Sequence, residues 1–255
     1  MKLFDLSGRV AIVTGGNGGI GYAIAEGLAR AGAAVAITGR NAAKGEAAAE
    51  QLRRAGARAL FVENDVADRD SNLRMVDSVT SAFGDIAILV NNAGLHVANS
   101  ADVMTGQQWD ADISVNLTGA FLCCQAVYPS MVARGGGKII NIASVGAFLG
   151  QPFAPNYAAS KGGVISLTKA LAVEWAKDNI QVNAILPGLI LTEMTGPGKQ
   201  VAPEFDRMVK SRTPARRWGD PEDFQGVAVF LASDASAFVT GAELVVDGGY
   251  SLPLY

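Results

Sequence analysis

Short apolar runs alternate with helical segments along the whole chain of 255 residues, and this alternation constrains the possible fold most strongly. The apolar runs predict seven strands, over residues 9–14, 34–38, 57–63, 86–91, 138–142, 181–186 and 243–246. Helical spacing predicts the main intervening helices, over residues 19–31, 42–55, 69–83, 109–132, 156–177 and 221–231. Such alternation is typical of a parallel sheet with helices on both faces. Because no linker or repeat interrupts the pattern, we predict a single α/β domain over residues 1–255 with a seven-stranded parallel sheet.

A glycine-rich turn, Thr14 to Gly21, joins the first predicted strand to the first helix. Glycines permit a tight turn and let backbone N–H groups approach a pyrophosphate at the N-terminus of the following helix. Two registers fit the spacing, one based on Gly15 and the other on the pattern Gly16-x-Gly18-x-x-Gly21. A purely structural turn is the alternative, but the strand before it and the helix after it favour a dinucleotide-binding site.

The end of the second predicted strand bears on the choice between NAD and NADP. An acidic residue there would bind the ribose 2′-hydroxyl of NAD, but the sequence has Gly39 followed by Arg40. Glycine leaves room for a 2′-phosphate and the arginine guanidinium can bind it, so NADP is favoured over NAD. A solvated arginine at a strand end is the alternative interpretation.

Tyr157 and Lys161 lie four residues apart at the start of a predicted helix, so their side chains are expected on one face. A free tyrosine loses its proton near pH ~10, and an adjacent cation lowers that pKa by favouring the phenolate. The pair is therefore a candidate proton donor or acceptor near neutral pH. Ser144, on the loop after an apolar strand, could hydrogen-bond a carbonyl oxygen beside the phenol.

These features together resemble the short-chain dehydrogenase/reductase family, and the resemblance covers essentially the whole chain. The family's Thr-Gly-x-x-x-Gly-x-Gly turn matches Thr14, Gly15, Gly19 and Gly21, which selects the first of the two registers. Further family motifs match in the expected order at Asp65-Val66, Asn91 to Gly94, Pro187-Gly188 and Val246 to Gly249.

The resemblance implies a Rossmann-type doubly wound fold and hydride transfer between a nicotinamide and a carbonyl or secondary alcohol. The implied catalytic set is Asn116, Ser144, Tyr157 and Lys161. Tyr157 would donate or remove the proton, and Lys161 would lower the pKa of Tyr157 and bind the nicotinamide ribose. Ser144 would hold the substrate oxygen, and Asn116 would help to position Lys161 through an ordered water.

The resemblance also implies a set of cofactor contacts, namely Gly15, Asn17, Gly19, Ile20, Gly21, Arg40, Asp65, Val66, Asn92, Ala93, Gly94, Tyr157, Lys161, Pro187, Gly188, Ile190 and Thr192. One departure from the family pattern concerns the glycine turn. Many NADP-using members have a basic residue where this chain has Gly18, so the NADP prediction rests on Arg40, with a modest contribution from Asn17.

The substrate pocket is expected to be lined by His96, Ser144, Phe148, Gln151, Phe153, Tyr157 and Met194. This mixture of apolar and polar side chains suits a small polyol, sugar acid or hydroxy-ketone, the class we favour, about as well as a cyclic or acyl ketone. A 3-oxoacyl carrier-protein reductase is an alternative, because Lys210, Arg216 and Arg217 could face an acidic carrier. A non-catalytic NADP-sensing regulator is the alternative from another class of protein.

Composition and sequence patterns also limit the partners, the cellular location and the metal sites that we expect. The net charge of −3 argues against nucleic acid or an anionic membrane as the main partner. No apolar run approaches the ~20 residues of a membrane helix and the N-terminus lacks a signal-peptide pattern, so a cytoplasmic location is expected. The adjacent Cys123 and Cys124 and a single histidine argue against disulfides and a metal site. Apolar helix faces indicate an interface between copies of the chain, and the family resemblance implies a homotetramer, with a dimer as the alternative.

Overall fold

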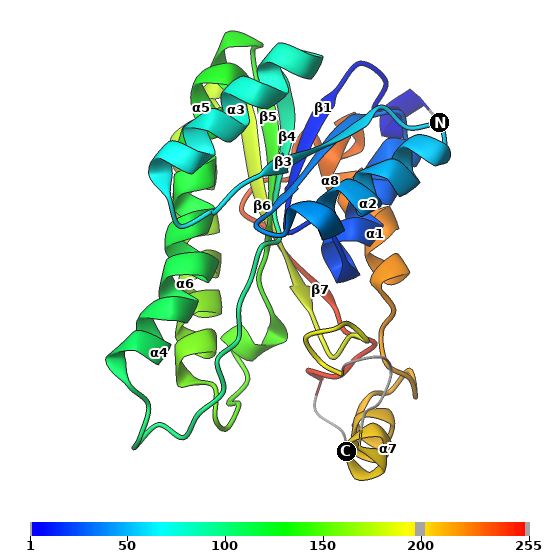
Figure 1. Ribbon diagram of the computed structural model, residues 1–255. Helices are drawn as coiled ribbons and strands as arrows, with labels where there is room; N and C mark the ends of the chain where they lie inside the picture. Colours follow the sequence, from blue (N-terminus) through cyan, green and yellow to red (C-terminus); the bar gives the residue numbers. More distant parts are fainter. Residues whose placement is uncertain (1, 197–201, 253–255) are drawn as a thin grey trace.

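A seven-stranded parallel sheet forms the centre of the computed structural model, which describes residues 2–196 and 202–252 (Figure 1). The strand order is β3-β2-β1-β4-β5-β6-β7, and every neighbouring pair is parallel. The strands are β1 Val10–Thr14, β2 Ala34–Gly39, β3 Ala59–Glu63, β4 Ile86–Asn91, β5 Gly137–Ile142, β6 Ile180–Pro187 and β7 Glu243–Val246. The predicted fold class and all seven strands are therefore confirmed, with ends that differ by at most two residues.

Helices cover both faces of this sheet, which is why its central strands are apolar throughout instead of alternating. One face packs against α1 Gly19–Arg30, α2 Ala42–Arg54 and α8 Gln225–Ala232. The other face packs against α3 Arg69–Phe83, α5 Gly119–Ala133 and α6 Pro155–Trp175 (Figure 1). Two further helices, α4 Gly106–Asp112 and α7 Pro203–Arg212, lie beyond the carboxyl ends of the strands.

The predicted helix over residues 109–132 proves to be longer and irregular. It begins at Gly106, because Thr105 and Gln108 form a capping box in which each side chain bonds the other residue's backbone N–H. Between α4 and α5 the chain forms a π-helix, Ile113–Thr118, whose wider turn carries Asn116 inward. Apolar periodicity does not reveal such a change in hydrogen-bond register.

Gly45 lies inside α2, where glycine ordinarily weakens a helix. A Cβ atom at this position would collide with the ring of Phe61 on β3. The glycine therefore lets α2 approach the sheet closely, and the helix continues through it without interruption.

The continuous helical stretch of residues 106–133 is long and apolar enough to cross a membrane by length and composition alone. Buried helices of soluble proteins pass the same test, so the match is weak support for a membrane span. One side of this stretch is buried in the core, through Cys123, Cys124, Val127 and Met131.

Candidate active site

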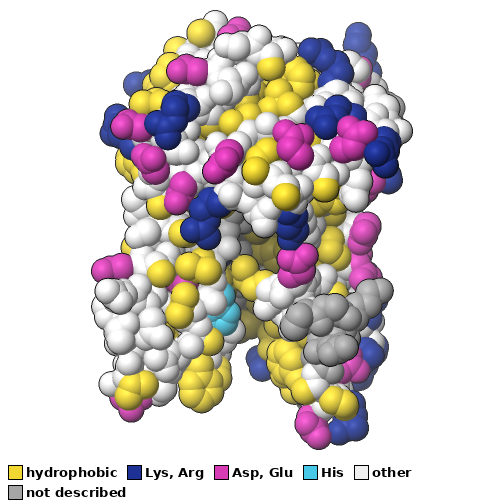
Figure 2. Space-filling model, in the orientation of Figure 1, with side chains coloured by type: hydrophobic (Ala, Val, Ile, Leu, Met, Phe, Trp, Pro, Cys, Tyr) yellow, Lys and Arg dark blue, Asp and Glu magenta, His cyan; other side chains and the backbone are white. Residues whose placement is uncertain are grey.

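A cavity of about 340 Å³ opens at the carboxyl ends of β1, β4, β5 and β6. The strand order reverses between β1 and β4, and open α/β sheets bind ligands in the crevice outside such a reversal. Figure 2 shows the cleft in the lower half of the molecule, with a histidine on its wall. Most of the predicted cofactor contacts line the cavity: Gly15, Asn17, Gly19, Ile20, Asn92, Ala93, Gly94, Tyr157, Lys161, Pro187, Gly188, Ile190 and Thr192.

The glycine turn is held by the end of β4. The hydroxyl of Thr14 accepts hydrogen bonds from the backbone N–H groups of Asn92 and Ala93, each at 3.0 Å. The Asn92 amide donates to the carbonyls of Thr14 and Gly15, at 3.0 and 3.1 Å. Gly15 has a φ of +63°, and a Cβ there would lie 2.9 Å from the Cα of Ala93. The turn is therefore closed against β4 in a conformation that requires glycine.

The N-terminus of α1 faces this cavity without a side-chain cap, because its N-cap residue is Gly18. The neighbouring helices α2, α3 and α4 are capped instead by the side chains of Asn41, Asp68 and Thr105. The first N–H groups of α1 have no partner within their own helix, and such groups bind anions. The turn therefore fits the pyrophosphate of a dinucleotide.

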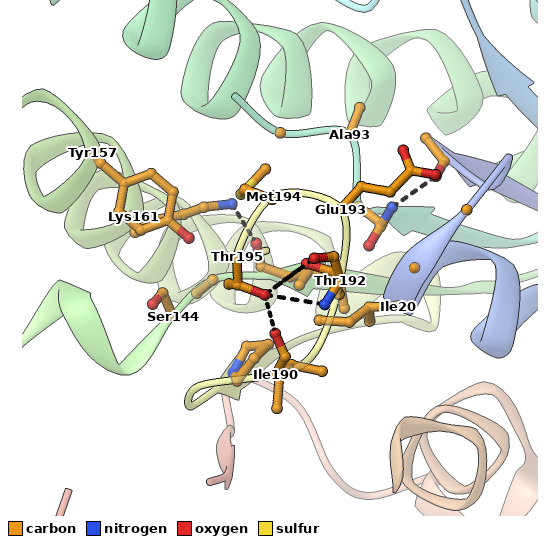
Figure 3. A pocket seen from close by; sticks show the side chains of 18 of the residues that line it. Ile20, Ala93, Ser144, Tyr157, Lys161, Ile190, Thr192, Glu193, Met194 and Thr195 are labelled. Carbon is orange, nitrogen blue, oxygen red and sulfur yellow. Dashed lines mark hydrogen bonds between the residues drawn. The ribbon is translucent and has the colours of Figure 1, made fainter. Parts of the chain in front are cut away.

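The loop after β6 forms the opposite side of the cavity, and the hydroxyl of Thr195 fixes its conformation through hydrogen bonds. Thr195 Oγ1 donates to the Ile190 carbonyl at 2.5 Å and accepts from the Thr192 N–H at 3.0 Å (Figure 3). This small ring of hydrogen bonds holds Ile190 and Thr192 at the cavity wall.

Tyr157 and Lys161 project from the first turns of α6, which begins at Pro155, a residue well suited to the first helical position. Both line the cavity together with Ser144, which follows β5 (Figure 3). The Lys161 ammonium donates to the Ile142 carbonyl at 2.8 Å and lies 5.7 Å from the centre of the Tyr157 ring. Burial lowers the pKa of Lys161 to about 8, while the carboxylate of Asp112 acts in the opposite direction.

In this structure burial, rather than Lys161, has the largest effect on the pKa of Tyr157. Burial raises the pKa of Tyr157 above its ordinary value, the nearby Ser144 hydroxyl lowers it, and the Asp112 carboxylate raises it. Lys161 directs its ammonium group to a backbone carbonyl, which explains why it does not dominate the electrostatics of the phenol.

Asn116 is buried and forms no hydrogen bond with Lys161 among the described residues, but its side-chain oxygen and the Lys161 ammonium both lie beside Gly94 at the cavity, each within 4 Å of a Cβ built there. Its side-chain oxygen accepts from the Leu95 N–H at 2.7 Å, and its amide donates to the Leu95 carbonyl and to Ser160 Oγ, at 2.9 and 3.0 Å. Asn116 therefore ties the chain after β4 to α6, and in this structure it acts as a positioning residue.

Asp112 was not predicted from the sequence, yet it is fully buried beside the catalytic candidates. One carboxylate oxygen accepts from the Val97 N–H at 3.0 Å, whereas the other has no hydrogen-bond partner among the described residues. Burial raises the pKa of Asp112, and the Val97 N–H, His96 and Lys161 lower it. The position of Asp112 four residues before Asn116, on the same helical face, was the available signal.

His96 packs beside the phenol, although it is outside the lining of the cavity. Its ring centre is 4.9 Å from that of Tyr157, and the two rings are tilted by 46°. Its Nε2 atom is buried without a partner among the described residues. A substrate hydroxyl or carboxylate beside Tyr157 could supply that partner.

Exchanging Asp112 tests why a carboxylate is buried there. We expect Asp112→Ala to lower the free energy of unfolding by about 1–3 kcal/mol, because the Val97 N–H loses its acceptor. The matched variant Asp112→Asn keeps an oxygen acceptor without the buried charge, so its stability is expected within about 1 kcal/mol of the native chain. Urea unfolding followed by circular dichroism measures both, and an equal loss in the two variants would contradict this interpretation.

Several predicted contacts lie elsewhere in the structure. Phe148 and Phe153 are 51% and 62% exposed and do not line the cavity, because residues 148–153 form a surface loop. Gln151 is also outside the lining, but its side-chain oxygen reaches the neighbourhood of Ser144 and Tyr157, since all three would lie within 4 Å of a Cβ on Gly146. Of the predicted substrate residues, Ser144, Tyr157 and Met194 line the cavity.

Four predicted cofactor contacts also lie outside the lining, namely Gly21, Arg40, Asp65 and Val66. Gly21 is buried behind the turn against Asn92. Val66 is buried in the core, where a Cβ on Gly119 would lie 2.7 Å from its side chain, and Asp65 accepts from the Ala67 N–H. Arg40 is exposed at the end of β2.

Lys44 and Glu193 line the cavity, and the sequence analysis missed both. They form an ion pair of 2.6 Å that joins α2 to the loop after β6. A Cβ on Gly18 would lie 3.1 Å from the Lys44 ammonium, so this cation sits directly over the glycine turn. No local pattern in the sequence places Lys44 at the cavity, since Arg40 precedes α2 and lies outside the lining.

Known proteins resemble the chain along nearly its full length. A family model whose description is enoyl-(acyl carrier protein) reductase matches residues 15–251. Gluconate 5-dehydrogenase of Gluconobacter oxydans is 42% identical over 99% of this chain and 98% of its own length. D-threitol dehydrogenase of Mycolicibacterium smegmatis is 43% identical over 98% of this chain and 95% of its own.

Among solved structures, gluconate 5-dehydrogenase from Burkholderia cenocepacia in complex with NADP and tartrate is 42% identical. It has a TM-score of 0.94 and covers 99% of both chains. Taken with the fold, the glycine turn and the Tyr157–Lys161 pair, these matches show that the chain belongs to the short-chain dehydrogenase/reductase family.

Proposed function

We propose that the chain is an NADP(H)-dependent oxidoreductase that interconverts a secondary alcohol and a ketone on a sugar acid or polyol. The observation that carries this proposal is the grouping of Ser144, Tyr157 and Lys161 at one wall of the cavity that the glycine turn closes. The relatives named gluconate 5-dehydrogenase and D-threitol dehydrogenase support the substrate class.

The bound cofactor would supply or accept the hydride, and the protein would align the substrate and handle the proton. In ketone reduction, the Tyr157 phenol gives its proton to the substrate oxygen as that oxygen becomes an alkoxide. The Ser144 hydroxyl donates a second hydrogen bond to the same oxygen. A buried Tyr157 with a raised pKa is protonated at neutral pH, which suits it to act as the acid in this direction.

Alcohol oxidation requires the reverse transfer, from the substrate hydroxyl to the phenolate. The nearby Lys161 cation favours that phenolate when its ammonium turns from the Ile142 carbonyl toward the ribose and the phenol. His96 offers a polar contact to a further hydroxyl or carboxylate of the substrate. Sugar acids and polyols carry such groups next to the reacting carbon.

Lys44 supports a preference for NADP over NAD more directly than Arg40 does. Its ammonium lies over the glycine turn at Gly18 and lines the cavity, whereas Arg40 lies outside the lining. Glu193 is its ion-pair partner, and a 2′-phosphate would compete with that exposed carboxylate for the cation. Arg40 and Lys44 would then hold the 2′-phosphate together.

Initial rates with D-gluconate and D-threitol, each with NADP or NAD, test this function. We expect turnover of at least one of them, with kcat/KM about tenfold or more higher for NADP. Lys44→Met should lower kcat/KM for NADP by about tenfold, since a charge-assisted hydrogen bond is lost, and should leave the NAD value almost unchanged. The matched control Lys210→Met removes an exposed lysine outside the cavity.

A preference for NAD would overturn the proposed role of Lys44 and Arg40 without affecting the catalytic group. Absence of turnover with both substrates and both cofactors would overturn the proposed reaction. A carrier-protein substrate has less support, because Lys210 pairs with Asp206 and Arg217 with Asp223. These ion pairs neutralise two of the three cations proposed to face an acidic carrier, which leaves Arg216.

The homotetramer and the cytoplasmic location belong to this proposal as well. Large apolar side chains on the helices of one face are exposed, among them Trp109, Phe121, Val132 and Val173. Association of copies through α5 and α6 would cover them. The apolar tail of residues 250–255 could also reach a neighbouring subunit, and residues 253–255 lie outside the described part of the chain.

A further inference from the structure

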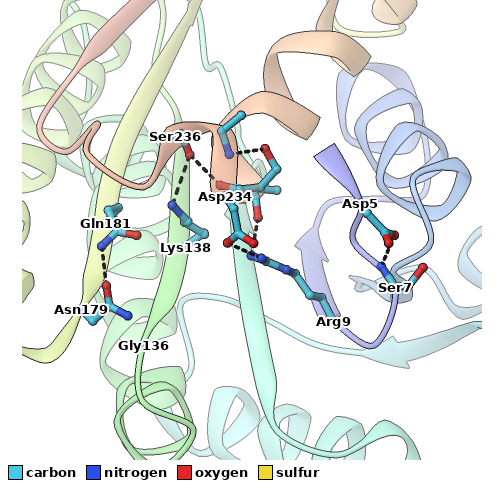
Figure 4. Close-up of polar contacts among 12 residues, drawn as sticks. Asp5, Ser7, Arg9, Gly136, Lys138, Asn179, Gln181, Asp234 and Ser236 are labelled. Atoms are coloured by element: carbon cyan, nitrogen blue, oxygen red, sulfur yellow. Dashed lines mark hydrogen bonds and ion pairs between the residues drawn. The ribbon is translucent and has the colours of Figure 1, made fainter. Parts of the chain in front are cut away.

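A second cavity, of about 270 Å³, lies at the amino ends of the strands, at the end of the sheet opposite the candidate active site. Arg9 before β1, Lys138 on β5 and Gln181 on β6 line it, together with Asp234 (Figure 4). Arg134, which follows α5, lines it as well. Open α/β sheets ordinarily bind their ligands at the carboxyl ends of the strands, so the proposed function does not account for this cavity.

The cations of this cavity outnumber its carboxylates. Arg9 is neutralised, because it bonds Asp234 at 2.5 Å and the Ala232 carbonyl at 3.0 Å. Arg134 donates to the Gly136 carbonyl at 2.7 Å, and Lys138 donates to Ser236 Oγ at 3.3 Å. Over residues 2–196 and 202–252, no carboxylate lies within 4.0 Å of either Arg134 or Lys138.

Lys138 is the group that most requires an explanation. It is only 5% exposed, and lysines are almost never buried without a counter-charge. Its ammonium carries three hydrogens, but one hydroxyl at 3.3 Å is its only hydrogen-bond partner among the described residues. Burial and the neighbouring Arg9 lower the pKa of Lys138 to about 8, so the group is still mostly charged at neutral pH.

Other charges near the cavity do not neutralise Lys138. Asp234 already pairs with Arg9 and is largely exposed. Asp85 acts on Arg134 but is exposed and does not line the cavity. Arg9 and Arg134 line the same cavity, where burial and the Arg9 cation lower the pKa of Arg134 and the Asp85 and Asp234 carboxylates raise it.

We propose that this cavity binds a phosphate group, free or carried on a small organic molecule, with Lys138 and Arg134 as its ligands. Two cations without carboxylate partners match the two charges of a phosphate dianion, whereas one carboxylate would neutralise only one of them. Arginine presents a planar set of donors to phosphate oxygens, and lysine supplies a compact charge. The cavity is larger than inorganic phosphate, and the Asn179 and Gln181 side chains at its border could bond hydroxyls of an attached group.

Binding of inorganic phosphate, measured by calorimetry at constant ionic strength with NADPH saturating, tests the proposal. The excess NADPH keeps phosphate out of the cofactor cavity. We expect saturable binding of one phosphate per chain, weakened about tenfold or more in both Lys138→Met and Arg134→Gln. Lys210→Met, which removes a lysine paired with Asp206 outside both cavities, should bind as the native protein does.

A parallel titration with D-glucose 6-phosphate distinguishes the two sources of the phosphate group. Tighter binding of the sugar phosphate assigns the site to a phosphate ester, and equal binding assigns it to free phosphate. No saturable binding of either probe, or binding that Arg134→Gln and Lys138→Met leave unchanged, would overturn the proposal. If Lys138→Met fails to fold, phosphate binding by Arg134→Gln alone tests the proposal, because Arg134 is exposed and its replacement leaves the core intact.

Discussion

Replacing Tyr157 by phenylalanine is expected to lower kcat by a factor on the order of 10² to 10⁴, the usual contribution of a positioned acid or base. The substitution removes only the phenolic oxygen, which is the atom that would exchange a proton with the substrate. The ring still packs against His96 and beside Lys161, so the cavity keeps its shape. The dissociation constant for NADPH, measured by fluorescence titration, should change by less than about threefold, because cofactor binding rests mainly on the turn and the strand ends.

Tyr128→Phe is the matched control for this experiment. Tyr128 lies on α5 outside the cavity and donates its hydroxyl to Asp178 at 2.8 Å. Loss of that hydrogen bond should lower stability slightly and leave kcat near the native value. Near-native turnover of Tyr157→Phe would contradict the catalytic assignment, and loss of NADPH binding would show that the variant disturbs the site instead.

Gly21→Ala is expected to weaken NADPH binding by at least about tenfold and to lower the free energy of unfolding by about 2–4 kcal/mol. The added Cβ would collide with the Asn92 side chain and lie 2.5 Å from the Gly15 carbonyl oxygen. Asn92 holds both carbonyls of the turn, so displacing it removes the hydrogen bonds that close the turn against β4. Fluorescence titration and urea unfolding measure the two effects.

Gly226→Ala supplies the control, because Gly226 is also helical and a Cβ there would meet no atom within 4 Å. Alanine is the better helix former, so this variant should be more stable by about 0.5–1 kcal/mol with unchanged NADPH affinity. A Gly21→Ala protein that binds NADPH normally would show that the turn tolerates displacement of Asn92.

The sheet was predictable because its central strands are buried between two helix layers and are therefore mostly apolar. The π-helix at Ile113–Thr118 was not, because apolar spacing does not report which carbonyl each N–H bonds. Asp112 was missed for a related reason. A carboxylate in a sequence is ordinarily expected at the surface, and only the packing of α4 against the chain after β4 buries it.

Whether a predicted site residue lies at the cavity depends on whether it is on a strand or helix or on a loop. Residues on strand ends and on the first turns of helices, such as Ser144, Tyr157 and Lys161, lie at the cavity as expected. Phe148 and Phe153 do not, because an apolar side chain on a loop can face either way, and residue type does not specify which. Lys44 enters the lining through the angle at which α2 leaves β2, which no local pattern encodes.

Strand β5 carries Lys138 near its start and ends at Ile142, whose carbonyl accepts the hydrogen bond from Lys161. These two positions lie four residues apart, a separation of about 13 Å along an extended strand, and side chains 138, 140 and 142 share one face. Gaining or losing a single residue between them would turn every later side chain to the opposite face. Insertions and deletions can therefore be tolerated in the surface loops of this chain. The stretch of β5 from Lys138 to Ile142 must keep its number of residues, because it sets the face on which each end meets its lysine.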